Sequence, residues 1–331
     1  MEIRSERQLN PVADDLSALV AVTRPILAGL LHSIGEEFLV AHGGREGLRL
    51  GDLGRVRKAN DGDAGVAFEY AVHDAVMNGD AVVTERVADA LSQCRITHGD
   101  PKSILFAIEK TGSKQLIDTA RDLVTDDSSI LSGTVGRPAK LKPRLNQLAA
   151  AFHRPDTRLA LPYSIQGLWK ADLFLGSSDQ DRWVGTSIRI NGKLEAARGL
   201  RIAIVPVGTV RTDRIYTDDQ RRLVVCPLPH DYSFMQKFHE GLRIVQALVA
   251  KDFRELTPAE LPNPIHREVA RIYAERRDFA IPEVLAATNA FAQPELLMPS
   301  QETVSTDLLD SDVEPQTSTM IGPVPRTVTE D

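Results

Sequence analysis

Three apolar or alternating runs in the middle of the chain constrain its fold more than any other feature. They span residues 167–175, 182–190 and 200–207, and turn-rich stretches separate them. Runs of this length, bounded by turn residues, are typical of β-strands. A fourth run at 223–227 has the same character. The short connections favour antiparallel neighbours for the three central strands.

Helical patterns flank this predicted sheet on both sides. Apolar residues recur at helical spacing from 11 to 42, where Pro25 predicts a kink and Gly43-Gly44 predicts the end. Further helices are expected at 64–77, 81–93, 113–124, 141–153, 231–251, 257–278 and 281–290, with one more strand at 103–108. The predicted fold class is therefore α/β or α+β, a small mixed central sheet flanked by N-terminal and C-terminal helices.

Composition is that of an ordinary globular protein. Hydrophobic residues make up 42% of the 331 residues and charged residues 26%. No apolar run approaches the roughly 18 to 20 residues that a membrane span needs, and the N-terminus lacks the apolar core of a signal peptide. The two cysteines are too few for a disulfide framework. We therefore expect a cytoplasmic protein that does not contact a membrane.

The negative charge of the chain is concentrated at its C-terminal end. From Ser300 onward there are seven acidic residues and one basic residue, so this stretch carries −6 of the total −7 and leaves the rest near −1. A nearly neutral body can still present a basic groove to a polyanion. The composition predicts three parts: an N-terminal helical region (1–60), an α/β core (61–292) and an acidic, disordered tail (293–331).

Asp172 is the most informative single residue. It lies between Ala171 and Leu173 in an apolar run, and a carboxylate buried there is costly unless it is paired, hydrogen-bonded or bound to a metal. The next run places Ser187 and Arg189 on one face, since side chains alternate along a strand. The order along the chain is thus a helical acid, a strand acid and then a polar pair at the end of a second strand.

With Glu69 in the helix at 64–77, this order resembles the PD-(D/E)xK, or restriction-endonuclease-like, superfamily, over roughly residues 65–78 and 165–207. The resemblance implies a restriction-endonuclease-like core and a nuclease that cleaves phosphodiester bonds in DNA or RNA, in restriction, defence or repair. It also implies Mg²⁺ or Mn²⁺, because carboxylates in such sites hold the metal that activates water.

Carried over residue by residue, the resemblance makes Asp172 the strand aspartate and Glu69 the helix glutamate, both as metal ligands. Ser187 takes the acidic position of the second strand, and Arg189 takes the lysine position. Serine removes a metal ligand there, and arginine removes an amine with an adjustable pKa. Four residues are candidates to compensate, and otherwise the site is degenerate: Glu195 or Asp179 as the carboxylate, Lys170 or Lys193 as the amine.

The densest basic run lies between Gly136 and Arg144. Its cations are candidates for phosphate contacts: Arg137, Lys140, Lys142 and Arg144. The Gly-Arg-Pro core resembles an AT-hook, although Val135 stands where that motif has an arginine. A solvated loop is the alternative interpretation. The expected partner is nucleic acid, DNA before RNA, together with a homodimer or a partner protein.

Two hypotheses therefore remain open. In the first the chain is a metal-dependent nuclease, which the acid at position 172 favours. In the second it is a catalytically degenerate nuclease-like protein that binds nucleic acid or a partner, which Ser187 and Arg189 favour. The chain has no phosphate loop, dinucleotide-binding glycine motif or nucleophile elbow, which argues against P-loop NTPases, classical dinucleotide enzymes and α/β-hydrolases.

Overall fold

The computed structural model describes most of the chain in nine stretches. They cover residues 11–44, 46–56, 63–106, 123–131, 138–197, 199, 201–207, 213–230 and 233–292. The expected helix at 113–124 falls almost entirely outside these residues. The tail at 293–331 lies wholly outside them.

The centre of the molecule is one mixed sheet, which confirms the predicted α/β class. Its main path runs β1 (Lys102–Leu105), β4 (Leu173–Ser177), β5 (Arg182–Ile188), β6 (Arg201–Pro206), β8 (Leu223–Leu228) and β7 (Tyr216–Asp218). Two short strands, β2 (Ser129–Ile130) and β3 (Ala139–Lys140), pair with each other, and β2 also pairs with β5. The sequence patterns did not predict β2, β3 or β7.

Strand direction changes in the middle of this sheet. β1, β4 and β5 are antiparallel neighbours, whereas β5, β6 and β8 run parallel. The prediction of antiparallel pairing is correct for β4 and β5 and wrong for β5 and β6. Residues 189–197 lead away from β5 over one face of the sheet, where Leu194 and Ala197 pack against β6 and β8.

The strand predicted at 167–175 begins later than expected. Gly167 has a positive φ of 92°, which glycine adopts without strain. A single 3-10 turn, η3 (Leu168–Lys170), follows it, and β4 begins only at Leu173. The strands predicted at 182–190, 200–207 and 223–227 are confirmed within two residues at each end.

Most predicted helices are present. The helices are α1 (Pro11–His32), α2 (Glu36–Ala41), α3 (Leu50–Val56), α4 (Asp63–Asn78), α5 (Ala81–Gln93), α8 (Lys142–His153), α9 (Ser233–Ala250), α10 (Pro264–Ala274) and α11 (Ile281–Thr288). The single helix expected at 11–42 is wrong, because the extended backbone of Gly35 separates α1 from α2. α10 begins at Pro264 rather than near 257, since Asn263 caps it by accepting the Ile265 N–H.

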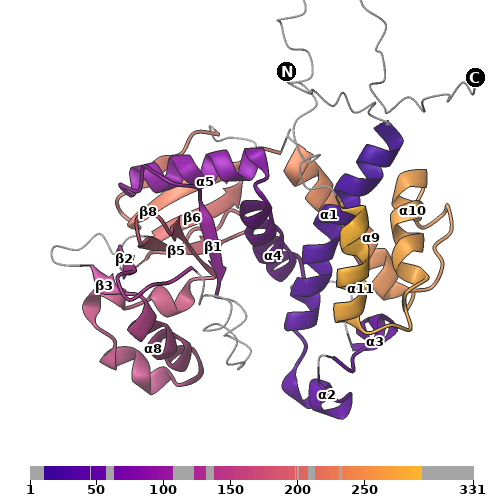
Figure 1. Cartoon of the computed structure of the whole chain (residues 1–331), viewed down its shortest axis with the longest axis horizontal. Helices are drawn as coiled ribbons and strands as arrows, with labels where there is room; N and C mark the ends of the chain where they lie inside the picture. Colours follow the sequence, from indigo (N-terminus) through magenta and orange to yellow (C-terminus); the bar gives the residue numbers. More distant parts are fainter. Residues whose placement is uncertain are drawn as a thin grey trace, which may run out of the picture.

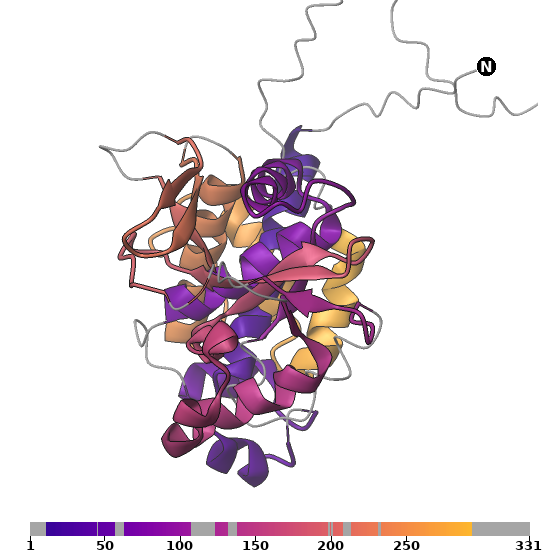
Figure 2. The same cartoon turned by 90° about the vertical axis from the view of Figure 1, so that its left-hand side faces the viewer.

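The sheet is covered on both faces and lies beside a helical half (Figures 1 and 2). In Figure 1, α4 lies between the sheet and α1, while α9, α10 and α11 pack on the other side of α1. One core joins Leu173 and Val184 of the sheet to Phe68 of α4 and Phe238 of α9. A second core, on the opposite sheet face, packs α8 and the 3-10 turns η2 (Tyr163–Ile165) and η3 against Trp183. The 3-10 turn η1 (Pro155–Ala160) follows α8 and has no buried residue.

α1 is long and apolar enough, by length and composition alone, to cross a membrane. Residues Asp14–His32 reach a mean hydropathy of 1.3 over a window long enough to cross a membrane, contrary to the expectation that no run comes close. However, 67% of that window is buried within the fold. α1 packs against α4, α9 and α10. This burial is consistent with the core helix of a soluble protein.

Asp80, at the start of α5, predicts that stability depends on pH. Its side chain is buried, and Oδ1 accepts a hydrogen bond from the Val83 N–H at 2.8 Å. Burial raises the pKa of this carboxyl to about 7. The folded protein then holds a proton that the unfolded chain loses near pH 4. The free energy of unfolding is therefore expected to fall as the pH rises from about 4 to about 7, by at most about 1.4 kcal/mol per pH unit.

The variant Asp80→Asn should remove this slope, because asparagine caps helices well and carries no charge. Thermal unfolding followed by circular dichroism from about pH 4 to pH 8 measures it. Asp156→Asn, at an exposed acid in η1, is the control and should keep the wild-type slope. Parallel curves for wild type and Asp80→Asn would contradict the assignment.

Candidate functional site

Asp172 lies at the end of the central strands where β4 begins and β5 ends. Its side chain is 2% exposed. Oδ2 accepts hydrogen bonds from the Ile188 N–H at 2.9 Å and from Nη1 of Arg189 at 3.1 Å. The backbone of Asp172 also bonds both neighbouring strands, donating to the Thr186 carbonyl and accepting from the Phe106 N–H. The buried carboxylate is therefore paired, and the structure brings Asp172 and Arg189 into direct contact.

Arg201, the first residue of β6, completes the cluster and was not singled out from the sequence. It is 4% exposed, and it donates from Nη1 to the Ser187 hydroxyl at 3.3 Å and from Nη2 to the Gly167 carbonyl at 2.5 Å. Burial lowers the pKa of Arg201, and the charge of Asp172 opposes that shift. The sequence does show an arginine at the start of an apolar strand, and this pattern could have identified Arg201 as a buried cation.

Lys170 and Glu195 form the exposed rim of this cluster. Their charged atoms lie 3.8 Å apart. The negative charge of Glu195 also raises the pKa of Arg201, so Glu195 is close enough to act on the buried guanidinium. Of the two carboxylates considered as replacements, Glu195 is thus near the site. Asp179 lies in the turn between β4 and β5, at the opposite end of both strands. Lys193 lies on the exposed connection after β5.

Glu69 lies on the far side of the sheet from part of this cluster. It is half-buried on α4, and α4 packs on the face that carries Leu173 and Val184. Ser187 and Arg201 alternate with core residues of that face, so their side chains point to the other face. The sheet therefore stands between the helix of Glu69 and two members of the cluster.

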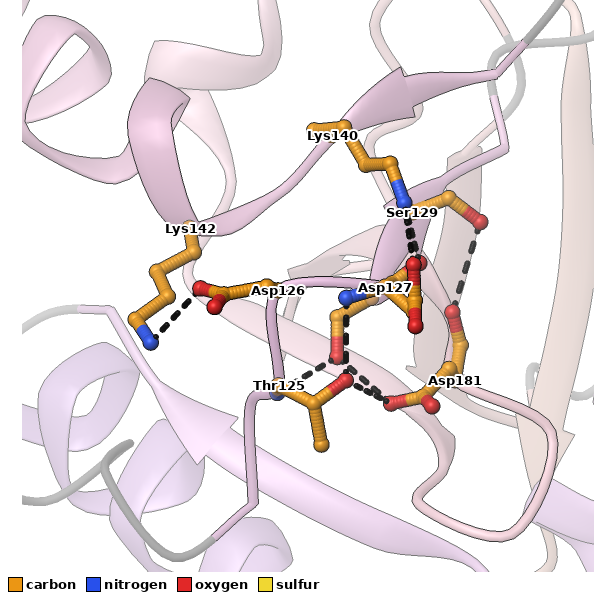
Figure 3. A network of polar contacts seen from close by, with 8 residues as sticks. Thr125, Asp126, Asp127, Ser129, Lys140, Lys142 and Asp181 are labelled. Carbon is orange, nitrogen blue, oxygen red and sulfur yellow. Dashed lines mark hydrogen bonds and ion pairs between the residues drawn. The ribbon is translucent and has the colours of Figure 1, made fainter.

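Two lysines of the predicted basic patch are paired with acids (Figure 3). Nζ of Lys140 lies 2.9 Å from Oδ1 of Asp127, and Nζ of Lys142 lies 2.9 Å from Oδ1 of Asp126. The ammonium of Lys142 holds the pKa of Asp126 below its usual value. The local charge of these two lysines is therefore offset by the two aspartates.

The turn that carries these aspartates is fixed to the β4–β5 turn. The hydroxyls of Thr125 and Ser128 both donate to Oδ1 of Asp181, and the Ser129 hydroxyl donates to the Asp181 carbonyl (Figure 3). The Ser129 N–H donates to the same carbonyl. Of the other two predicted patch residues, Arg144 donates to Gln147, at 2.6 Å. The remaining one, Arg137, lies outside the described residues.

The segment 142–170 overlaps the patch predicted from sequence and carries the same net positive charge. It holds five basic residues and one acidic residue, Asp156, which gives 5 − 1 = +4. Lys142 faces Asp126 and Lys170 faces Glu195, so +2 remains after both are set aside. The segment covers the sheet face on which Ser187 lies, and its last four residues include Gly167, which accepts from Arg201, and Lys170 on the rim. A cationic lobe thus ends at the Asp172 cluster.

The oxygen donors around Asp172 do not fit a divalent cation in the arrangement described. Mg²⁺ takes six oxygen ligands in near-octahedral geometry. Here Oδ2 of Asp172 already accepts two hydrogen bonds, and one donor is the positive guanidinium of Arg189. Ser187 binds the guanidinium of Arg201, and Glu195 lies against Lys170. Positive side chains hold the positions that a metal ion would need.

Three cavities lined by described residues lie in the helical half. One of about 660 Å³ is lined by His230, His239, Arg243 and His266 together with Glu240. Glu240 already interacts there with Gln236, Lys237 and His266. At the Asp172 cluster, Asp172, Ser187 and Arg201 are buried, and Arg189, Lys170 and Glu195 are the members that reach the surface.

Comparison with known proteins adds no relative to this description. No protein-family model matches the chain, and neither a curated protein nor a solved structure matches it. The chemistry of the site must therefore follow from its own residues.

Proposed function

We propose that this chain acts on nucleic acid, with the phosphodiester backbone bound at the edge formed by Asp172, Arg189, Arg201 and Lys170. One observation carries the proposal: the lobe at 142–170 has a net charge of +4 and ends at this cluster. Neutralising phosphates with basic side chains releases condensed counterions, which is the main source of affinity for nucleic acid. DNA is the first substrate to test and RNA the second.

The exposure of each cationic residue determines whether it contacts phosphate directly or acts only through its charge. Arg189 is 30% exposed and Lys170 is 49% exposed, so both can reach a phosphate from the edge. Asp172 fixes the orientation of Arg189, and a fixed guanidinium offers planar, paired donors that match phosphate oxygens. Arg201 is buried and contributes its field rather than a contact.

Hydrolysis of the bound phosphodiester is the second candidate. One observation favours it: Asp172 at the start of β4 and Ser187 and Arg189 at the end of β5 share one sheet edge, in the order that a restriction-endonuclease-like core requires. Because the described donors do not fit a metal, we derive no metal-dependent step from them.

The test is a binding and cleavage assay on plasmid, linear DNA and RNA, with Mg²⁺, Mn²⁺ or EDTA. Wild type should bind with EDTA present at low salt. Arg189→Gln should weaken binding by about tenfold, since a hydrogen bond to a charged group contributes roughly 1.5 kcal/mol. Arg189→Lys should recover part of the loss. Arg254→Gln, at an exposed arginine of the helical half, is the matched control and should bind as wild type does.

Three outcomes decide between the candidates. Cleavage that needs the metal and is lost in Asp172→Asn would establish the nuclease. Binding without cleavage would establish the degenerate, backbone-binding protein. Failure of wild type to bind any of the three substrates at low salt would reject both.

A further inference from the structure

The lobe at 142–170 also exposes aromatic and apolar side chains among its cations. Tyr163 is 62% exposed and Leu159 is 83% exposed, although both follow α8 in a segment that otherwise packs on the second core. Single exposed apolar side chains are ordinary on a protein surface, so what distinguishes Tyr163 and Leu159 is the basic segment that carries them. Their surroundings on the chain are basic, which limits the kinds of partner that fit.

Trp169 brings the aromatic and cationic features together. The guanidinium carbon of Arg158 lies 3.8 Å from the centroid of the Trp169 ring, and Nζ of Lys170 lies 5.5 Å from it. Nε of Arg158 also donates to the Ala151 carbonyl at 2.8 Å, which fixes the guanidinium over the ring. A cation held against an aromatic ring in this way favours stacked, negatively charged polymers.

We infer that this aromatic–cationic surface, made by Tyr163, Trp169, Arg158 and Lys170, binds single-stranded nucleic acid and leads it to the Asp172 cluster. Unpaired bases expose π-faces that stack on aromatic rings and on guanidinium planes, while the backbone follows the cations. A duplex hides its bases and would use only the cations. The net positive charge of the lobe argues against an acid-poor peptide as the occupant, and the exposed aromatic ring of Tyr163 favours unpaired bases over a second, acidic copy of this chain. This inference rests on the proposed function and names its substrate class.

The experiment measures binding of the full chain to a labelled oligothymidylate of about 20 nucleotides, which exceeds the roughly 4 to 16 nucleotides that one binding fold covers. A duplex of equal length is the comparison. Wild type should prefer the single strand. Tyr163→Ala should weaken single-strand binding by about tenfold, as expected for one lost stacking contact, and leave duplex binding unchanged. Tyr163→Phe should keep the affinity within about threefold, because the ring remains.

Phe279→Ala is the matched control, since Phe279 is an exposed aromatic residue of the helical half. It should leave both affinities unchanged. A second readout is tryptophan emission. The chain has two tryptophans, and Trp183 is fully buried, so a change on adding the single strand reports Trp169.

The outcomes separate this inference from the proposed function. Duplex binding that equals or exceeds single-strand binding, or single-strand binding unaffected by Tyr163→Ala, would overturn the stacking surface while leaving the backbone-binding function in place. An absence of binding to either probe would overturn both. Self-association lost in Tyr163→Ala, without nucleic-acid binding, would assign the surface to a second copy.

Discussion

Replacing Asp172 with alanine is expected to lower the free energy of unfolding by about 3 to 5 kcal/mol. The substitution removes the ion-pair partner of Arg189 and the acceptor of the Ile188 N–H. It also removes the negative charge that most strongly opposes the lowered pKa of buried Arg201. Breaking a buried ion pair by removing one partner costs about this much, because the remaining charge is neither solvated nor paired. Urea unfolding followed by tryptophan fluorescence measures the difference.

Asp179→Ala provides the matched control for this prediction. Asp179 is an exposed aspartate at the other end of the same two strands, so its loss should change stability by less than about 0.5 kcal/mol. Asp172→Asn retains the size of the side chain and removes its charge. A loss below about 1 kcal/mol in both Asp172 variants would show that the carboxylate does not balance Arg201 in solution.

The double substitution Arg158→Gln with Lys170→Gln is expected to lower nucleic-acid affinity by roughly 100-fold at low salt. Each removes one cation near the Asp172 cluster, and a hydrogen bond to a charged group contributes roughly 1.5 kcal/mol, or about tenfold. The plot of log affinity against log salt should become shallower by about 1.4, since each contact to a single strand adds roughly 0.7 to the slope.

The contrasting pair is Lys140→Gln with Lys142→Gln. These lysines were predicted from sequence to contact phosphate, but each already faces an aspartate at 2.9 Å. Their removal should reduce affinity and salt slope much less. Folding of both double variants is checked by thermal unfolding. A larger loss from the lysine pair than from Arg158 and Lys170 would place the polymer along β3 and the start of α8, and would contradict the interface proposed above.

Local patterns in the sequence were enough to locate most of the elements. The helix at 63–78 was predicted to within one residue at each end, and the helix at 81–93 was predicted with its observed bounds. Both predictions rest on apolar spacing and on turn residues such as Gly79, which depend only on neighbours along the chain. The strand beginning at Arg182 was predicted for the same reason. The burial of Asp172 also followed from its apolar neighbours. Interactions between residues a few positions apart can thus be predicted from the local sequence.

Only the tertiary structure decided which residues meet. Arg201 joins Ser187 and Gly167 because β6 lies parallel to β5, and that direction depends on a connection that crosses the sheet rather than turning back. The sequence showed Lys142 as a free cation, and the fold places Asp126 beside it. The sequence likewise shows Glu69 before Asp172 along the chain. Their order does not determine on which face of the sheet each side chain lies.

The division has a physical cause. Helix and strand propensity, turns and burial patterns arise from interactions between residues close in sequence. They can therefore be predicted from residue types and their spacing. Strand direction, register and ion pairs across elements are set by the packing of the whole core, where one change of direction moves every later side chain. The sequence by itself thus determined the elements and the buried carboxylate. The tertiary structure determined that this carboxylate is held by Arg189 and the Ile188 N–H at the end of a cationic lobe.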